Sequence, residues 1–313
     1  MKIAVMGSGG IGGYFGGLLA KGGEDVTFLA RGAHLAAIQR DGLRVESVAG
    51  NFHVRPAATD DPAAVGPIEL ILFSVKSYDT ETAAEQIRPL IGPGTAVLCV
   101  QNGVDNEEKL EARVGADRIL YGVVHVLSTI KAPGVIAQTG GPRTLRFGER
   151  DGRRSLRTTR ILEVMKQAGI HADVSSKILI DLWEKFVFIC AQGGVTALAR
   201  LDIGAILGCP ETARLYRGVM EEIAAVGRAK GVRLPDDTVA RTLRWAQTLQ
   251  PTMRSSLAYD LEHGNRLEVD ALVGAVVRYG AEVGVPTPLN AAIYACLLPH
   301  HLRAMATRGA QSA

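Results

Sequence analysis

A glycine-rich turn between a strand and a helix constrains the fold of this chain more than any other feature. The apolar run at residues 2–6 (KIAVM) leads into Gly7-Ser8-Gly9-Gly10-Ile11-Gly12, and a helical segment continues to Leu19. In this setting Gly7 permits a tight turn, Gly9 lets backbone N–H groups approach a pyrophosphate, and Gly12 allows the helix to pack closely on the strand. The dipole of the helix favours an anion at this end. The pattern predicts a dinucleotide-binding turn, and the alternative is a plain glycine-rich turn.

The rest of the first half continues the alternation of strand and helix. Runs rich in β-forming residues recur at DVTFLA, IELILFSV and TAVLCVQN, with helical segments between them, which is typical of a parallel sheet covered by helices. Three later runs, YGVVHVL, GVIAQT and TLRFGE, are separated by Pro-Gly or Gly-Pro and predict hairpins at the far edge of the sheet. Apolar residues at helical spacing predict a helix over residues 155–168 that closes this domain.

From about Ser175 the strand signal ends and helical periodicity takes over. The predicted fold class is α/β, with an N-terminal Rossmann-type doubly wound sheet in residues 1–174 and an all-α C-terminal domain in residues 175–313. The second domain should begin with one long helix near Lys177. A length of 313 residues with 47% hydrophobic content agrees with two domains.

Charge and composition argue against several classes of partner. The formal net charge is +3 and the Lys and Arg residues are dispersed, so we expect neither a nucleic acid nor a membrane partner. No apolar stretch reaches the roughly 18 residues of a membrane span or resembles a signal peptide, so we expect a cytoplasmic protein. The cysteines lie far apart and the histidines form no cluster, which predicts reduced thiols, apolar surroundings for all but Cys209, and no metal site. The oligomeric state stays open, with a homodimer as one option.

The end of the second predicted strand indicates which nicotinamide cofactor binds. About 20 residues beyond the glycine motif, an NAD enzyme places an Asp or Glu for the ribose 2′-hydroxyl. This chain has Arg31 there, while Glu24 and Asp25 precede the strand and so lie at its opposite end. A guanidinium suits a 2′-phosphate, which favours NADP(H); the alternative is a solvated loop arginine.

Two further strands end at polar residues that would face the same edge of the sheet. Lys76 follows LILFSV, and Asn102 follows AVLCVQ. Because open α/β sheets bind ligands outside the carboxyl ends of their strands, Lys76 could contact cofactor phosphate or ribose, and Asn102 could contact ribose or substrate. Asn102-Gly103 could equally be a turn former.

Lys185 is a charged residue in an otherwise apolar helix. It stands in LWEKFVFICA, directly before six apolar residues. Reduction of a carbonyl needs an acid or a cation at the oxygen, where negative charge develops. Burial lowers the pKa of a lysine and makes it a usable proton donor, but a lysine can also pack its stem while its ammonium reaches water. The pattern leaves both interpretations open.

The last candidates lie in the C-terminal half. Glu268 follows Gly264 and Asn265, which break one helix, and we expect its carboxylate to open the next helix. Ser255 and Ser256 precede another helical stretch, where their hydroxyls could bind a substrate carboxylate or cap the helix.

Taken together, these segments resemble the ketopantoate reductase (2-dehydropantoate 2-reductase) family over about residues 1–300. The matching segments are GSGGIGGYFG, LAR, SVK, QNGV, LWEKF with VTAL, RSSLAYDLEHG and RLEVDAL. The glycine motif is shared by many dehydrogenases, so the joint presence of WEK, the double serine and LEVD makes the resemblance specific. It implies NADPH-dependent reduction of ketopantoate, or of a related 2-oxo acid, to the 2-hydroxy acid in pantothenate (coenzyme A) biosynthesis.

The resemblance also implies roles for individual residues. Lys185 would be the catalytic acid, and Glu268 would engage the substrate hydroxyl and orient Lys185. Ser256 would bind the substrate carboxylate, and Asn102 would order the ternary complex. Lys76 and Arg31 would hold NADPH beside the glycine motif.

The chain departs from the family pattern at three positions. The usual pattern has asparagines where this chain has Ile189, Gly193 and Met253, and those amides normally line the substrate pocket. Their replacement predicts a more apolar pocket, so a 2-oxo acid with a bulkier apolar tail becomes a competing substrate.

Two other functions remain open at this stage. One is a dehydrogenase for a different 2-oxo acid or for a 3-hydroxy acid, since β-hydroxyacid dehydrogenases also pair a Rossmann domain with a helical domain and a catalytic lysine. The other is an NADPH-sensing protein without turnover, although the presence of Lys185 and Glu268 speaks against it. The direction of the reaction in the cell also stays open.

Overall fold

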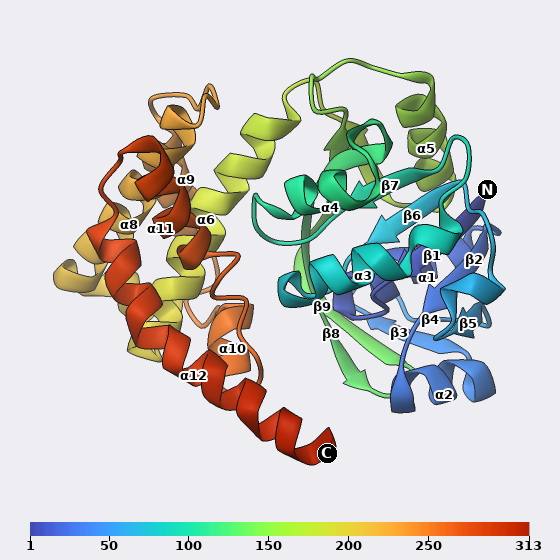
Figure 1. Cartoon of the computed structure of the whole chain (residues 1–313). Coiled ribbons are helices and arrows are strands. Elements are labelled where there is room, and N and C mark those ends of the chain that lie inside the picture. Colours follow the sequence, from blue (N-terminus) through green and yellow to red (C-terminus); the bar gives the residue numbers. More distant parts are fainter. Residues whose placement is uncertain (313) are drawn as a thin grey trace. The chain divides into compact units, whose positions relative to one another are not determined.

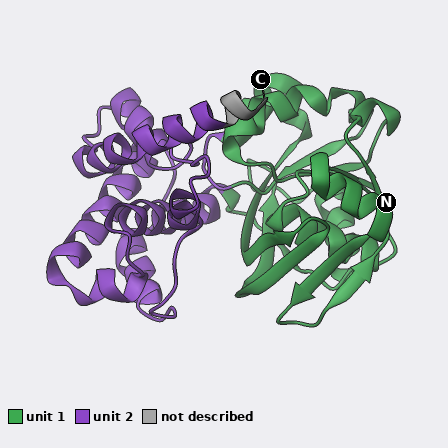
Figure 2. Ribbon diagram, turned by 90° about the horizontal axis from the view of Figure 1, so that it is seen from below, with its two compact units in different colours: residues 1–101, 106–178 green, residues 102–105, 179–313 purple. Residues whose placement is uncertain are grey.

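The computed structural model describes residues 1–312, with side chains up to residue 307. The chain divides into two compact units (Figure 2). Unit 1 contains residues 1–101 and 106–178, and unit 2 contains residues 102–105 and 179–313. The domain ranges that we predicted from the sequence differ from these units at residues 175–178 and at the short loop 102–105.

Unit 1 is built on a ten-stranded sheet (Figure 1). Its strands are β1 (Lys2–Met6), β2 (Asp25–Leu29), β3 (Leu43–Ser47), β4 (Phe52–Val54), β5 (Ala57–Thr59), β6 (Leu70–Phe73), β7 (Ala96–Cys99), β8 (Ile119–Ala132), β9 (Val135–Gly148) and β10 (His171–Val174). Its helices are α1 (Gly10–Lys21), α2 (Gly32–Asp41), α3 (Thr80–Gln86), α4 (Asn106–Val114) and α5 (Leu156–Gln167).

The strand order confirms the predicted Rossmann-type sheet. Strands β5, β2, β1, β6, β7 and β8 are neighbours in that order and run parallel. The chain starts in the middle, at β1, and builds outward first on one side and then on the other, which is the doubly wound pattern. The carboxyl ends of β1 and β6 therefore flank the point at which such sheets bind ligands.

Helix α1 is enclosed by strands on two sides. A Cβ atom at Gly16 would lie 2.6 Å from Cγ2 of Val5 on β1, and one at Gly13 would lie 2.6 Å from Cγ1 of Ile136 on β9. Each glycine costs a helix about 0.5–1 kcal/mol relative to alanine, so their presence here reflects close packing rather than helix propensity. The sheet therefore curls around α1.

The hairpin after β8 differs from the prediction. Pro133-Gly134 does form a turn, between β8 and β9, but Gly141-Pro142 lies inside β9, opposite a register shift in the pairing near Leu127. Gly141 has φ +79° and Arg143 has φ +57°, so the strand accommodates the Gly-Pro step as an irregularity. The expected series of hairpins at the sheet's far edge was wrong, because β9 is one long strand and pairs with β3 on its other side.

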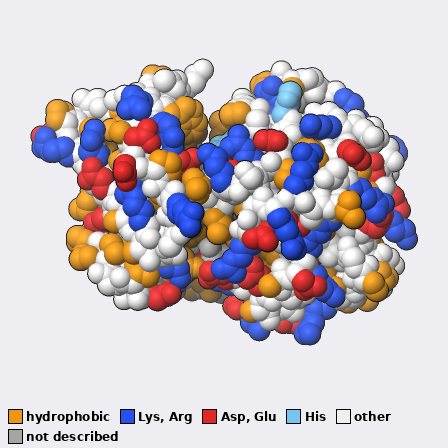
Figure 3. All heavy atoms as spheres, turned by 90° about the horizontal axis from the view of Figure 1, so that it is seen from above, with side chains coloured by type: hydrophobic (Ala, Val, Ile, Leu, Met, Phe, Trp, Pro, Cys, Tyr) orange, Lys and Arg blue, Asp and Glu red, His pale blue; other side chains and the backbone are white. Residues whose placement is uncertain are grey.

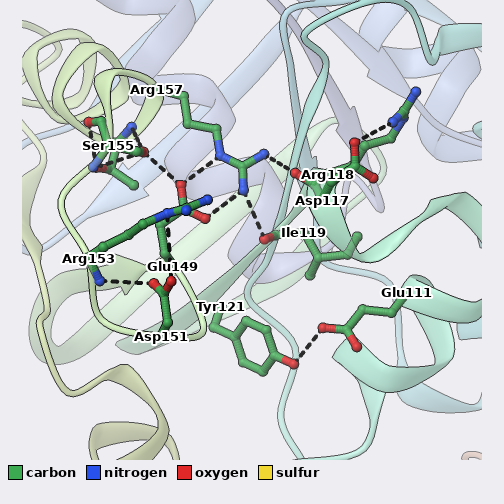
Figure 4. Close-up of polar contacts among 11 residues, drawn as sticks. Glu111, Asp117, Arg118, Ile119, Tyr121, Glu149, Asp151, Arg153, Ser155 and Arg157 are labelled. Carbon is green, nitrogen blue, oxygen red and sulfur yellow. Dashed lines mark hydrogen bonds and ion pairs between the residues drawn. The ribbon is translucent and has the colours of Figure 1, made fainter.

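Helix α5 forms within residues 155–168, as their periodicity predicted, but it does not close unit 1, because strand β10 follows it and pairs with β9. Ser155 caps it in a capping box with Thr158 and also donates to the Glu149 carboxylate at 2.6 Å (Figure 4). Arg157 donates to both oxygens of Glu149, at 2.8 and 2.6 Å, and to the carbonyl oxygen of Asp117. Burial raises the pKa of Glu149, but these hydrogen bonds outweigh it and hold the pKa below its usual value.

Unit 2 is helical, as predicted. Its helices are α6 (Ile178–Ala199), α7 (Ile203–Gly208), α8 (Pro210–Ala229), α9 (Thr238–Ala246), α10 (Ser256–Glu262), α11 (Val273–Val283) and α12 (Pro288–Ser312). The long helix expected near Lys177 is α6. Of the described helices, none combines the length and the apolar character that crossing a membrane requires.

The cysteines are all free thiols. Cys99 and Cys190 are buried, whereas Cys209 and Cys296 are exposed. The expectation of apolar surroundings was therefore wrong for Cys296, since the face of α12 that carries it points to solvent. Within residues 1–312 no group of His, Cys, Asp and Glu side chains could hold a metal ion.

Candidate active site

The glycine turn after β1 has surroundings that fit a bound pyrophosphate. Gly7 adopts φ +101°, which favours glycine, and a Cβ atom at Gly12 would lie 2.9 Å from Cγ1 of Val5 on the strand. A Cβ atom at Gly9 would meet nothing within 4 Å, so the backbone there is open to an approaching group. Ser8, Gly10 and Ile11 complete the same turn at the start of α1.

His34 on α2 holds this turn from the side. Gly134 N donates a hydrogen bond to His34 Nδ1 at 3.1 Å, and His34 Nε2 lies 2.9 Å from the carbonyl oxygen of Ser8. Because a backbone N–H can only donate, Nδ1 must accept, and the ring is neutral with its proton on Nε2. Burial lowers the pKa of His34 below 6.5, against the opposing effect of the Ser8 hydrogen bond. Sequence reasoning missed His34, whose partner Gly134 lies 100 residues away.

The segment after β6 packs directly on the glycine turn. A Cβ atom at Gly7 would lie 2.7 Å from the backbone nitrogen of Val75, and Ser74 Oγ donates to the Gly7 carbonyl at 2.9 Å. Lys76 follows immediately and is half-buried. The structure thus brings Lys76 and the glycine motif to the same edge of the sheet.

Gln101 joins the loops that follow β6 and β7. Its Nε2 atom donates to the carbonyl oxygen of Val75 at 2.9 Å and to Thr80 Oγ1 at 2.8 Å. Thr80 Oγ1 in turn donates to Asn106 at 3.0 Å. Sequence reasoning did not single out Gln101, and the available signal was its position directly after a buried strand.

Arg31 lies where the sequence placed it, but with a neighbour that was not expected. It precedes α2 directly after β2, and its Nη2 atom donates to Oδ2 of Asp79 at 3.3 Å. The interpretation that a guanidinium alone occupies this position was therefore wrong, because a carboxylate from the loop after β6 lies beside it. No local pattern signals this pair, since 48 residues separate its members.

In unit 2, Lys185 on α6 is buried and bound to Asn102. Its side chain is 9% exposed, and Nζ donates to Asn102 Oδ1 at 2.9 Å. The ammonium therefore points to an amide oxygen instead of reaching bulk water as a snorkelling lysine would. Asn102 belongs to the loop that directly follows β7. This loop therefore supplies the side-chain oxygen that accepts the hydrogen bond from Lys185.

The loop 102–105 has a second contact with unit 2. Arg278 Nη2 on α11 binds Asp105 Oδ2 at 3.0 Å, and Asp105 is buried. Burial, together with the Asp105 charge, raises the pKa of the Cys190 thiol well above its usual value, so Cys190 stays neutral. Contacts at both ends of the loop explain why it belongs with the helical unit.

Glu268 is buried, but the structure corrects its local setting. It is 7% exposed and lies in the turns between α10 and α11, where its carbonyl oxygen accepts from Leu272 N at 3.1 Å. Helix α11 starts only at Val273, so the carboxylate does not lie in the first helical turn as expected. Gly264, with φ +64°, does end α10 as predicted.

The two serines at the start of α10 have different roles. Ser255 caps α10 by accepting from Ala258 N at 3.0 Å, and its Oγ lies 2.8 Å from Thr196 Oγ1. Thr196 donates its hydroxyl hydrogen to the Gln192 carbonyl, so Ser255 must be the donor in the Ser255–Thr196 contact. The donor hydrogen of Ser255 is thereby used, whereas Ser256 is exposed and its hydroxyl has no partner among the described residues.

The three positions that depart from the family pattern have partly apolar surroundings. Ile189 and Met253 are half-buried, and Gly193 is buried on α6. A Cβ atom at Gly193 would lie 3.6 Å from Leu257 and 3.8 Å from Leu272, at ordinary contact distance. A side chain at position 193 would therefore enter a leucine-lined space.

Charged side chains show no gathering of one sign on the face seen in Figure 3, where Lys and Arg are interspersed with Asp and Glu.

A doubly wound sheet with an open glycine turn, joined to a helical unit that holds a buried lysine, defines a pyridine nucleotide-dependent oxidoreductase of the Rossmann type.

Comparisons with known proteins identify the family. Family models described as ketopantoate reductase PanE/ApbA and its C-terminal part match residues 3–152 and 177–301. A 2-dehydropantoate 2-reductase of Mesorhizobium japonicum is 35% identical, with 94% of this chain and 96% of the relative covered. The chain therefore belongs to the ketopantoate reductase family and is an oxidoreductase of the class that acts on CH–OH groups.

Solved structures agree with this placement. A ketopantoate reductase of the PanE/ApbA family from Ralstonia eutropha JMP134 matches with a TM-score of 0.90 and 34% identity, covering 97% of this chain and 100% of the other. A D-mandelate dehydrogenase, solved with NADH and anilino(oxo)acetate, shares the fold at a TM-score of 0.89, covering 97% of this chain and 99% of the other. At 20% sequence identity, the likeness to this dehydrogenase concerns the fold alone.

The tautomer of His34 generates a pH prediction. Its folded pKa lies below 6.5, so its contribution to stability is complete above about pH 6.5 and is lost as the pH falls toward the folded pKa. The charged ring cannot accept from Gly134 N. Between about pH 7.5 and about pH 5, we expect the wild type to lose about 1 kcal/mol more unfolding free energy than His34→Gln, measured by urea denaturation.

His171→Gln is the matched control, because His171 is exposed on β10. Its pH profile should follow that of the wild type. Equal pH slopes for the wild type and His34→Gln would contradict the assignment of a neutral, hydrogen-bonded ring.

Proposed function

We propose that the protein uses NADPH to reduce the 2-carbonyl of ketopantoate, or of a related 2-oxo acid, to the 2-hydroxy acid, a step in pantothenate (coenzyme A) biosynthesis. The observation that carries the proposal is the buried Lys185 ammonium bound to Asn102, on the loop that follows the Rossmann strand β7. The glycine turn, Lys76 and Arg31 would hold the cofactor, which supplies the hydride when bound.

Lys185 would act at the carbonyl oxygen. As the carbonyl is reduced, negative charge develops on this oxygen, and a buried ammonium stabilises it strongly because water does not screen the interaction. Nζ would then donate a proton to the oxygen and complete the hydroxyl group. Asn102 Oδ1, which accepts from Nζ at 2.9 Å, fixes the direction in which the ammonium points.

Glu268 and Ser256 would bind the other groups of the substrate. A buried carboxylate such as Glu268 can accept from the substrate hydroxyl and complement the Lys185 charge. The hydroxyl of Ser256 would donate a hydrogen bond to the substrate carboxylate, whereas the hydroxyl of Ser255 already donates to Thr196. This difference supports Ser256 over its neighbour as the substrate ligand.

The test of the proposed function is turnover. Purified protein should consume NADPH, followed by its near-ultraviolet absorbance, when ketopantoate or a branched 2-oxo acid is added. Because Ile189, Gly193 and Met253 offer no amide, we expect a 2-oxo acid with a larger apolar tail to match or exceed ketopantoate in kcat/KM. A far higher kcat/KM for ketopantoate would contradict the apolar pocket, and NADPH binding without turnover on any acid would favour the sensing protein.

Lys185→Ala should separate chemistry from cofactor binding. Loss of the acid should lower kcat by about 10²- to 10⁴-fold and leave the Kd for NADPH within about twofold. Lys177→Ala, which removes an exposed lysine just before α6, is the matched control and should keep normal turnover. Near-normal kcat in Lys185→Ala would refute the catalytic assignment.

The two serines should respond differently to substitution. Ser256→Ala should raise KM for the oxo acid by about 10-fold or more, because a hydrogen bond to a charged group is lost, and should leave stability unchanged. Ser255→Ala should lower the unfolding free energy by about 1 kcal/mol through loss of the helix cap, with a smaller effect on KM. Steady-state kinetics and urea denaturation of both variants measure this contrast, and the reverse pattern would exchange the two roles.

A further inference from the structure

Arg31 and Asp79 form an exposed ion pair at the edge of the sheet that carries the glycine turn. Arg31 Nη2 lies 3.3 Å from Asp79 Oδ2, with side-chain exposures of 77% and 30%. Arg31 follows β2, and Asp79 ends a short 3₁₀ turn (Ser77–Asp79) after Lys76 and β6. Because β2 and β6 are the two neighbours of β1, these loops flank the glycine turn from opposite sides.

We propose that Asp79 is a cofactor-selectivity residue, whose carboxylate competes with the 2′-phosphate of NADPH for Arg31. The inference rests on the proposed function in one respect, namely that NADPH binds with its phosphate on Arg31. It goes further, because it assigns to Asp79 an effect that lowers the preference of this chain for NADPH over NADH.

Competition follows from the geometry of the pair. A phosphate that binds the Arg31 guanidinium must either take the N–H group that Asp79 now accepts from or lie close to the Asp79 carboxylate. The phosphate carries roughly 1.5 to 2 negative charges near neutral pH, so the carboxylate repels it. Since an exposed ion pair is weak, the phosphate can displace Asp79, and the effect is a reduced affinity instead of exclusion.

The same carboxylate does not disfavour NADH. Without the 2′-phosphate, the ribose presents a 2′-hydroxyl, which is a hydrogen-bond donor that carboxylates accept from in NAD enzymes. Asp79 therefore weakens the binding of NADPH without a comparable effect on NADH. Arg31 raises the preference for NADPH, and Asp79 lowers it.

Equilibrium binding tests the proposal without turnover. The Kd values of NADPH and NADH are measured by isothermal titration calorimetry for the wild type, Asp79→Asn, Arg31→Met and the double variant. Asp79→Asn should tighten NADPH about five- to tenfold and change NADH by less than about twofold. The gain should shrink as ionic strength rises, because Arg31 is exposed and Asp79 is partly exposed, and most of it should vanish in the Arg31→Met background.

The matched control is Asp41→Asn. Asp41 is another exposed carboxylate of unit 1 that pairs with an arginine, Arg40, at 2.6 Å, at the far end of α2 from Arg31. The variant changes the net charge equally, so both cofactor Kd values should stay within about twofold of the wild type.

The outcomes separate this inference from the proposed function. If Arg31→Met weakens NADPH but Asp79→Asn leaves it unchanged, only the role of Asp79 fails. If Asp79→Asn weakens NADPH, Asp79 orients Arg31 instead of competing for it, and the inference is overturned. If Arg31→Met leaves the Kd for NADPH unchanged, the assignment of NADPH to this site fails, and the inference on Asp79 fails as well.

Discussion

The close approach of α1 to the strands around it is the constraint on which unit 1 depends. Gly16 faces Val5 and Phe28 on one side of the helix, and Gly13 faces Ile136 on the other, at distances that leave no room for a Cβ atom. Helix α1 can therefore pack this closely on the strands only with glycine at these positions. The same packing holds the glycine turn before α1 between the loops that follow β2 and β6. The packing that curls the sheet also presents the open backbone at Gly9 for a cofactor.

The chemistry proposed for unit 2 depends in a similar way on one short loop. Gln101 binds groups of unit 1, whereas Asn102, the next residue, binds Lys185 of unit 2. Asp105 adds a second attachment through Arg278. A buried ammonium is tolerated because an amide oxygen accepts from it, so the residues that position the proposed acid come from a part of the chain far from the acid itself.

Local patterns predicted much of this molecule, and long-range pairs account for what they missed. The glycine motif, the helix α5 and the start of α6 depend on neighbouring residues, and the sequence predicted each of them. The contact of His34 with Gly134 and the pair of Arg31 with Asp79 join distant segments, so no spacing rule signals them. Glu268 was misplaced for a related reason: Gly264 does end α10, but nothing local shows that α11 starts only at Val273. The predicted roles of the site residues and the cytoplasmic location stay predictions.

The assignment of residues 102–105 to the helical unit has a consequence for dissecting the protein. A fragment starting at residue 179 would contain every helix from α7 onward but would lack the amide that binds Lys185 and the carboxylate that binds Arg278. The C-terminal half is thus not a module that can be cut out or exchanged at one junction. A chimaera between two relatives would have to exchange this four-residue loop, embedded in the N-terminal half, together with the helices.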